Sequence, residues 1–143
     1  MKLAYQVVSL ELAKKLKELG VKQESAFYWI HGKQWPDDGD VFWLSPADKA
    51  KGIAPRNTPK RVEIIAAFTV AELGDILPQV IKLNGKTFQL FISVGLDKQW
   101  FVVYANEKDY HDNAPFKIMF CHSEADARAK MLIHLIEKGI VKA

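Results

Sequence analysis

Cysteine is nearly absent from this sequence, which has only Cys121 among 143 residues. One cysteine cannot form a disulfide within the chain, and it excludes a zinc site built from four cysteines. Long apolar runs are also missing: 64–68 and 100–105 are far shorter than the roughly 20 residues that cross a bilayer. The N-terminal residues do not have the pattern of a signal peptide. We therefore expect a cytoplasmic protein without a membrane partner.

An excess of one charge is lacking as well. The 20 Lys and Arg residues against 17 Asp and Glu residues give a net charge of +3, which is too small to indicate a nucleic-acid partner by itself. What is present is ordinary for a globular protein, with 49% hydrophobic and 26% charged residues, and this excludes a disordered chain. The length fits one domain, so we predict a single α+β domain over residues 1–143.

Helical patterns occur at both ends of the chain and near its middle. Leucines recur at helical spacing over 9–19, after a possible N-cap at Ser9 and before Gly20. A capping-box pattern at 69–72 predicts a short helix that ends before Pro78. Ser123 opens a longer C-terminal helix, which stops at Gly139. A further turn or two of helix is predicted after 45–48.

Strand patterns fill the remaining regular segments. The clearest signal is Asn84-Gly85, which joins two alternating runs and predicts a type I′ hairpin. The predicted strands are 26–30, 41–44, 62–66, 81–83, 86–94, 100–105 and 116–121. Short connections favour antiparallel pairing. The sequence thus predicts an antiparallel sheet of about five to seven strands, packed against the N- and C-terminal helices, with a short middle helix.

Three stretches together resemble a known group of proteins. They are a capped helix leading to an aromatic strand (9–21, 23–25 and 27–29), the segment 67–78, and the C-terminal 126–137. This set is similar to small uncharacterised proteins encoded in bacteriophages, prophages and mobile elements, with 33–61 the least similar part. The shared motifs are structural. The resemblance therefore implies a bacterial cytoplasmic or phage context, and it assigns no catalytic residue.

Signals for enzymatic chemistry are few. No two of the four histidines have the spacing of a zinc-protease or zinc-finger pair, and the chain has no P-loop or nucleophile elbow. Cys121 with His122 or His111 as base is the one candidate nucleophile, although adjacent strand residues point to opposite faces. We therefore predict a protein that is not an enzyme and has no metal or cofactor. A small thiol-dependent enzyme remains an alternative.

A basic window is the main candidate for binding. Residues 49–61 contain no acid, and Trp35 and Trp43 precede them. A basic loop beside exposed aromatic rings can hold phosphates and stack bases, which makes nucleic-acid binding one hypothesis. The candidate binding residues are Trp35, Trp43, Lys49, Lys51, Arg56, Lys60 and Arg61.

Protein binding is the hypothesis that we prefer. Eight Phe, four Trp and four Tyr are many for one small core. Trp35, Trp43 or Tyr110, if exposed, would be the anchors that dominate protein interfaces. A strand such as 41–44 or 116–121 at a sheet edge can also pair with a partner. The sequence thus favours a non-enzymatic accessory protein that binds another macromolecule.

Overall fold

The computed structural model describes residues 2–33, 40–53, 62–112 and 115–143, and for 33, 40, 41, 51–53 and 62 the backbone course alone. The predicted sequence of helices and strands is confirmed. The elements in chain order are the 3₁₀ helix η1 (Leu3–Tyr5), α1 (Leu10–Glu18), β1 (Phe27–Lys33), β2 (Asp40–Pro46), α2 (Ala47–Ile53), β3 (Val62–Ala66), α3 (Val70–Ile76), β4 (Val80–Leu83), β5 (Lys86–Val94), β6 (Trp100–Asn106), β7 (Met119–Cys121) and α4 (Glu124–Glu137).

The strands form two antiparallel sheets. The first has the order β2-β1-β3, and the second has the order β4-β5-β6-β7. In the second sheet, Asn84 and Gly85 have φ angles of 52° and 75°, so both central residues of the β4–β5 turn have the positive φ that a type I′ hairpin requires. The α+β class and the antiparallel pairing are thus as predicted.

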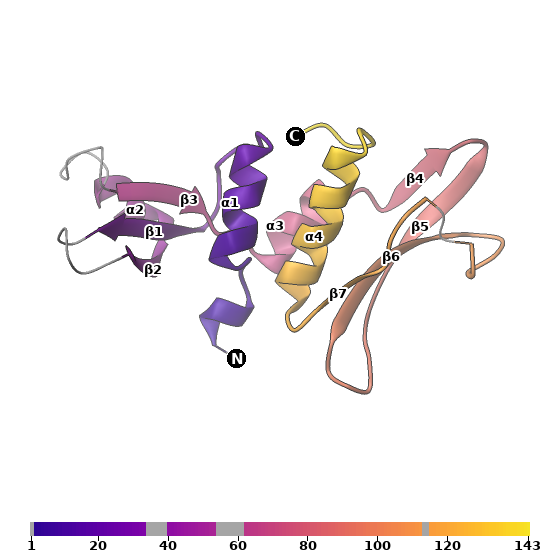
Figure 1. Ribbon diagram of the computed structural model, residues 1–143, viewed down its shortest axis with the longest axis horizontal. Helices are drawn as coiled ribbons and strands as arrows, with labels where there is room; N and C mark the ends of the chain where they lie inside the picture. Colours follow the sequence, from indigo (N-terminus) through magenta and orange to yellow (C-terminus); the bar gives the residue numbers. More distant parts are fainter. Residues whose placement is uncertain (1, 34–39, 54–61, 113–114) are drawn as a thin grey trace.

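The helices α1, α3 and α4 lie between the two sheets, whereas α2 lies beside β1 and β2, as Figure 1 shows. α1 packs against β3 of the first sheet, and α4 packs against β6 and β7 of the second. α1 and α4 also pack against each other, and α3 packs against α4. The prediction of one sheet covered by both terminal helices is therefore wrong in this respect: each helix covers a different sheet.

A capped sheet edge explains why the strands do not continue into one sheet. The backbone N–H of Ala66 donates to Oε1 of Gln23 at 2.9 Å, and Nζ of Lys17 donates to the carbonyl of Ile64 at 3.3 Å. These side chains bind the backbone groups on the free side of β3, where a fourth strand would pair. α3 and Pro78 then carry the chain away before β4 begins.

Glu72 connects α3 to the start of β1. Thr69 and Glu72 form the predicted capping box. The Glu72 carboxylate also accepts from the hydroxyl of Ser25 and from the backbone N–H of Ala26, both at 2.8 Å. Burial raises the pKa of Glu72, but the hydrogen bonds to the carboxylate outweigh it and lower the pKa overall.

The last strand is shorter than predicted. β7 begins at Met119 rather than at Phe116. The Phe116 ring is instead buried, with its centroid 5.0 Å from that of Phe88 and 5.2 Å from that of Tyr104. Tyr104 itself donates to the carbonyl of Pro78 at 2.6 Å, and burial raises the pKa of its hydroxyl. Aromatic packing thus replaced strand pairing in this segment.

Candidate functional site

The residues proposed for binding from the sequence are only partly described. Trp43 lies in β2 with 40% of its surface exposed, and Lys49 lies exposed in α2. α2 packs against β1 and β2, so these two residues belong to one region. Lys51 also lies in α2, whereas Trp35, Arg56, Lys60 and Arg61 fall outside the described residues. The basic cluster as a whole is therefore not tested.

β2 presents large apolar side chains on both of its faces. Phe42 and Trp43 are adjacent in the strand, so their side chains point to opposite faces. Phe42 is 55% exposed. Its ring lies edge-on to that of Trp29, with centroids 5.7 Å apart and planes at 69°. Both exposed aromatic residues are thus carried on a paired strand, which limits their freedom to move.

A pocket of about 540 Å³ opens beside Phe42. α1 packs over β3 rather than over β2, and this leaves space above the outer part of the sheet. The indole of Trp29 forms part of the wall and is fixed by a 2.8 Å hydrogen bond from Nε1 to the carbonyl of Val8. The lining residues are Ala4, Ser9, Leu10, Glu11, Lys14, Trp29, His31 and Phe42.

Charges of both signs surround this pocket. Glu11 and Lys14 lie three residues apart on α1, and no ion pair joins them to any described residue. His31 lies 3.8 Å from Glu63, measured from Nδ1 to Oε2. The pocket thus combines apolar walls with a rim that favours neither anions nor cations.

The candidate binding residues predicted from the sequence do not include Phe42 or the other residues of this pocket. Alternation along the two strands places Trp29 and Phe42 on one face, because Trp29 pairs with Leu44 and His31 pairs with Phe42. This signal was present in the aromatic pattern of 26–44. The position of α1 over β3 could not be read from the sequence, because it depends on contacts between segments far apart in the chain.

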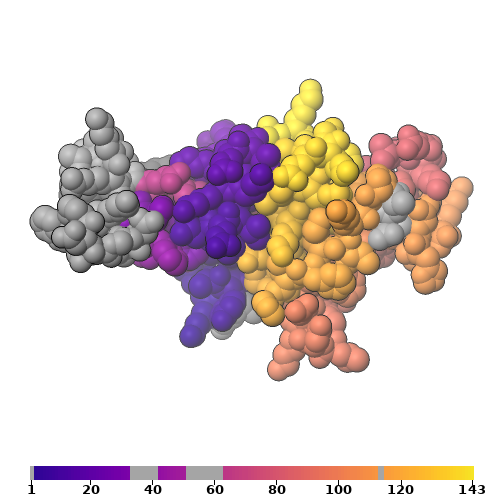
Figure 2. Space-filling view, in the orientation of Figure 1, coloured from indigo at the N-terminus to yellow at the C-terminus, as the bar shows by residue number. Residues whose placement is uncertain are grey.

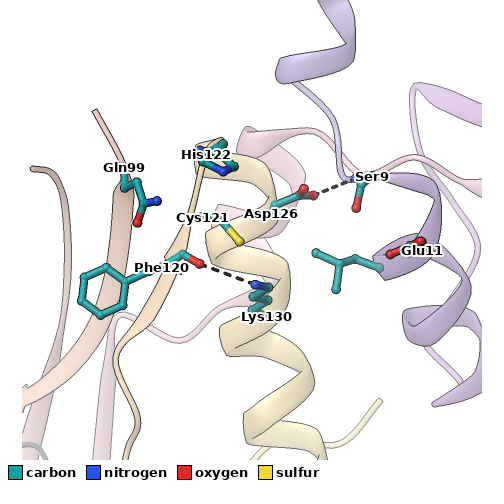
Figure 3. A pocket seen from close by; sticks show the side chains of 9 residues that line it. Ser9, Glu11, Gln99, Phe120, Cys121, His122, Asp126 and Lys130 are labelled. Carbon is teal, nitrogen blue, oxygen red and sulfur yellow. Dashed lines mark hydrogen bonds between the residues drawn. The ribbon is translucent and has the colours of Figure 1, made fainter. Parts of the chain in front are cut away.

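A second pocket, of about 340 Å³, contains Cys121 and is shown in Figure 3. It lies between α1, the end of β7 and the start of α4. Asp126 accepts from the backbone N–H of Ser9 at 2.7 Å, and Nζ of Lys130 donates to the carbonyl of Phe120 at 3.5 Å. Two of the polar side chains shown, Asp126 and Lys130, thus join these elements.

The thiol–imidazole pair suggested by the sequence is not formed in the described structure. Cys121 makes no hydrogen bond to a histidine among the described residues. Cys121 pairs with Trp100 at one end of β6, and His111 follows Asn106 at the other end. That separation is about 20 Å along a strand with a rise of about 3.3 Å per residue. His111 is therefore not placed to act as a base for Cys121.

No three His, Cys, Asp or Glu side chains in the described ranges are grouped so that they could hold a metal ion. Within the same ranges, no helix has the length and apolar character needed to span a membrane. Comparison of the chain with protein-family models, curated proteins and solved structures gives no match. Function therefore has to be argued from the site itself.

Proposed function

We propose that this chain is a non-enzymatic binding protein, and that it contacts another protein through the surface around β2. The supporting observation is that Phe42 and Trp43 are exposed on opposite faces of one strand, and that Phe42 lines a pocket together with Trp29. Large aromatic side chains held in fixed positions lose little entropy on binding and bury much apolar surface. These are the properties of an interface anchor.

Charge favours a protein over a nucleic acid as the partner. A phosphate-binding surface needs several cations that are free to release counterions. At the pocket, Lys14 is accompanied by Glu11. In α2, away from the pocket lining, Lys49 follows the acidic Asp48. An apolar surface with mixed charges matches the core and rim of a protein interface instead.

We also propose that the protein acts in a bacterial cytoplasmic or phage context. The resemblance to phage and mobile-element proteins supports an accessory role in a bacterial cytoplasm. The motifs that carry this resemblance are the capped helix of α1 with the aromatic strand after it, the segment 67–78 and the C-terminal 126–137.

Crosslinking in the cells that encode the chain tests the proposal. The wild type is compared with the double variant Phe42→Ser, Trp43→Ser. Leu96→Ser is the matched control, because Leu96 is a fully exposed apolar residue at the turn between β5 and β6, which protrudes far from β2 (Figure 2). We expect a protein that crosslinks to the wild type and to Leu96→Ser, with at least about a tenfold loss for the double variant.

Two results would count against protein binding through β2. One is equal crosslinking by all three chains, which would place the interface elsewhere. The other is capture of nucleic acid whose yield falls steeply with added salt, which would support the alternative built on Trp43 and Lys49. Circular dichroism of each variant checks that the exposed substitutions leave the fold intact.

A further inference from the structure

The free side of β2 can be derived from the hydrogen bonds of the first sheet. Ala47 N–H donates to the Ala26 carbonyl at 2.9 Å, so these two residues continue the β1–β2 register as a hydrogen-bonded pair. Such pairs alternate along an antiparallel ladder. Trp43 and Ser45 therefore direct their N–H and C=O groups toward β1. Phe42 and Leu44 direct theirs away from the sheet.

The other edge of this sheet and one edge of the second are capped by side chains. On β3, Gln23 and Lys17 bind the outward groups of Ala66 and Ile64. β7 has three residues, and the register with β6 turns only the backbone of Phe120 outward. The Phe120 carbonyl accepts from Lys130 at 3.5 Å. Neither edge offers an open row of donors and acceptors.

The remaining sheet edge, β4, is protected from pairing with another chain by its length and its residues rather than by capping side chains. It is four residues long. Leu90 N–H donates to the Gln79 carbonyl, so these two form a hydrogen-bonded pair of the β4–β5 register. Because such pairs alternate, the backbone groups of Val80 and Lys82 face outward. A short strand, a lysine at the edge and a preceding Pro78 are the features that discourage pairing with another chain. β2 differs, because it has seven residues and no described residue caps the outward groups of Phe42 and Leu44.

The pocket beside Phe42 lies where a side chain of an added strand would point. A residue paired opposite Phe42 would have its side chain on the same face of the sheet as Phe42, with Cβ atoms about 5 Å apart. That face carries Trp29 and His31, which line the pocket with Leu10. An apolar side chain at this position would therefore lie next to Phe42, on the same side of the sheet as the pocket.

A second copy of the chain does not supply such a side chain. In a two-fold pairing of β2 with β2, the residues on this face would be the other copy's Phe42 and Leu44. Phe42 already packs on Trp29 of its own chain, and Leu44 packs against its own core. A separate extended segment has its side chains free to fill the pocket.

We propose, on the basis of the protein-binding role above, that β2 takes up an extended segment of a partner protein as an additional strand. The outward N–H and C=O groups of Phe42 and Leu44 bind the backbone of that segment. One apolar side chain of the segment occupies the pocket lined by Phe42, Trp29 and Leu10. Backbone pairing then supplies affinity and the pocket supplies selectivity.

Amide hydrogen exchange measured by NMR tests the backbone pairing. The probe is the tightest-binding peptide selected on the wild-type chain from a random-peptide display library. In the free protein, we expect the amides of Trp43 and Ser45 to exchange slowly and those of Phe42 and Leu44 to exchange quickly. Saturation with the peptide should slow Phe42 and Leu44 by at least about tenfold. Unchanged exchange at both, or a library without a binder, would overturn the proposal.

Methylation of single backbone nitrogens in the same peptide gives a second, independent readout. Strand addition predicts that affinity falls by about tenfold or more at alternate positions and stays unchanged at those between, because only alternate N–H groups face β2. An equal loss of affinity at every methylated position, or no loss at any of them, would argue against strand addition. Weak dependence on salt is also expected, since the rim carries both charges, and a steep dependence would oppose the assignment.

The free chain has to be tested for self-pairing. If Phe42 and Leu44 are already protected in the free protein, and their protection increases with protein concentration, a second copy occupies β2 and the proposal fails. These outcomes are separable from the crosslinking result. Suppose that the crosslinked partner is lost on mutation of Phe42 and Trp43, but the amides of Phe42 and Leu44 still exchange quickly in the peptide complex. Protein binding through β2 would then stand, and the proposal of strand addition would fail.

Discussion

His134 is a titratable side chain inside the core, with 8% of its surface exposed. The imidazole donates to the backbone carbonyl of Pro115, and Nε2 has no hydrogen-bond partner among the described residues. Burial lowers the pKa of His134, and the positive charges of Lys138 and Lys117 lower it further, whereas Glu137 and the Pro115 hydrogen bond raise it. The folded protein thus holds this imidazole neutral.

The lowered pKa predicts acid sensitivity. The unfolded chain takes up the proton at its ordinary pKa of 6.5, before the folded chain does. The contribution to stability is therefore fully present above pH 6.5 and is lost as the pH falls toward the folded pKa, by at most about 1.4 kcal/mol per pH unit. Urea unfolding between about pH 5 and 7 measures this slope.

Replacement by glutamine isolates the effect of His134. His134→Gln keeps a donor for the Pro115 carbonyl and does not titrate, so its slope over this pH range should be smaller than that of the wild type. The exposed His122→Gln is the control and should keep the wild-type slope. Equal slopes for all three proteins would show that another group causes the acid sensitivity.

The two terminal helices begin at serines that have different roles. The hydroxyl of Ser123 accepts from Asp126 N–H at 3.1 Å and caps α4. The Ser9 side chain makes no capping bond at α1, although its position in the sequence predicts one. Its backbone N–H is held by Asp126 instead, at 2.7 Å. Asp126 thus connects the start of α4 to the start of α1.

Alanine substitution should separate these roles. Ser123→Ala is expected to lower the free energy of unfolding by about 1 kcal/mol, as the loss of a cap does. Ser9→Ala should cost less than about 0.5 kcal/mol, as a substitution away from any hydrogen bond does. Chemical denaturation of both variants provides the measurement. A larger loss for Ser9→Ala than for Ser123→Ala would contradict the assignment.

Most helices and strands were predictable because their signals are local. The capping box at Thr69, the positive φ at Asn84 and Gly85, and the helix end at Gly20 depend on a few neighbouring residues. The start of β7 was predicted wrongly, because alternation over 116–121 does not show that Phe116 packs on Phe88 and Tyr104. That contact joins residues from three separate segments.

One cluster of buried apolar side chains includes residues from both sheets and from the helices between them. It contains Ile30 and Ile65 of the first sheet, Leu16 and Leu132 of the helices, and Val102 of the second sheet. Each sheet thus relies on the same helix layer for part of its burial. This continuity predicts that the two sheets unfold together.

The variant Leu132→Ala tests this coupling. Leu132 is fully buried in α4, and its truncation should cost about 2–5 kcal/mol. In a Trp100→Phe background the remaining tryptophans, at 29, 35 and 43, report on the N-terminal half. Their fluorescence and the far-UV circular dichroism should shift together. Separate transitions would contradict the prediction of a single domain, and Leu96→Ser is the unperturbed control.

The sequence by itself determined the helices, the strands, the antiparallel pairing and the presence of excess aromatic residues, because these follow from local propensities and periodicity. Only the tertiary structure decided that the strands divide into two sheets, and that α1 covers β3 but not β2. Side chains of Gln23 and Lys17 close one edge, and the helix position leaves the pocket beside Phe42. Such contacts depend on how distant segments pack, which no local pattern records.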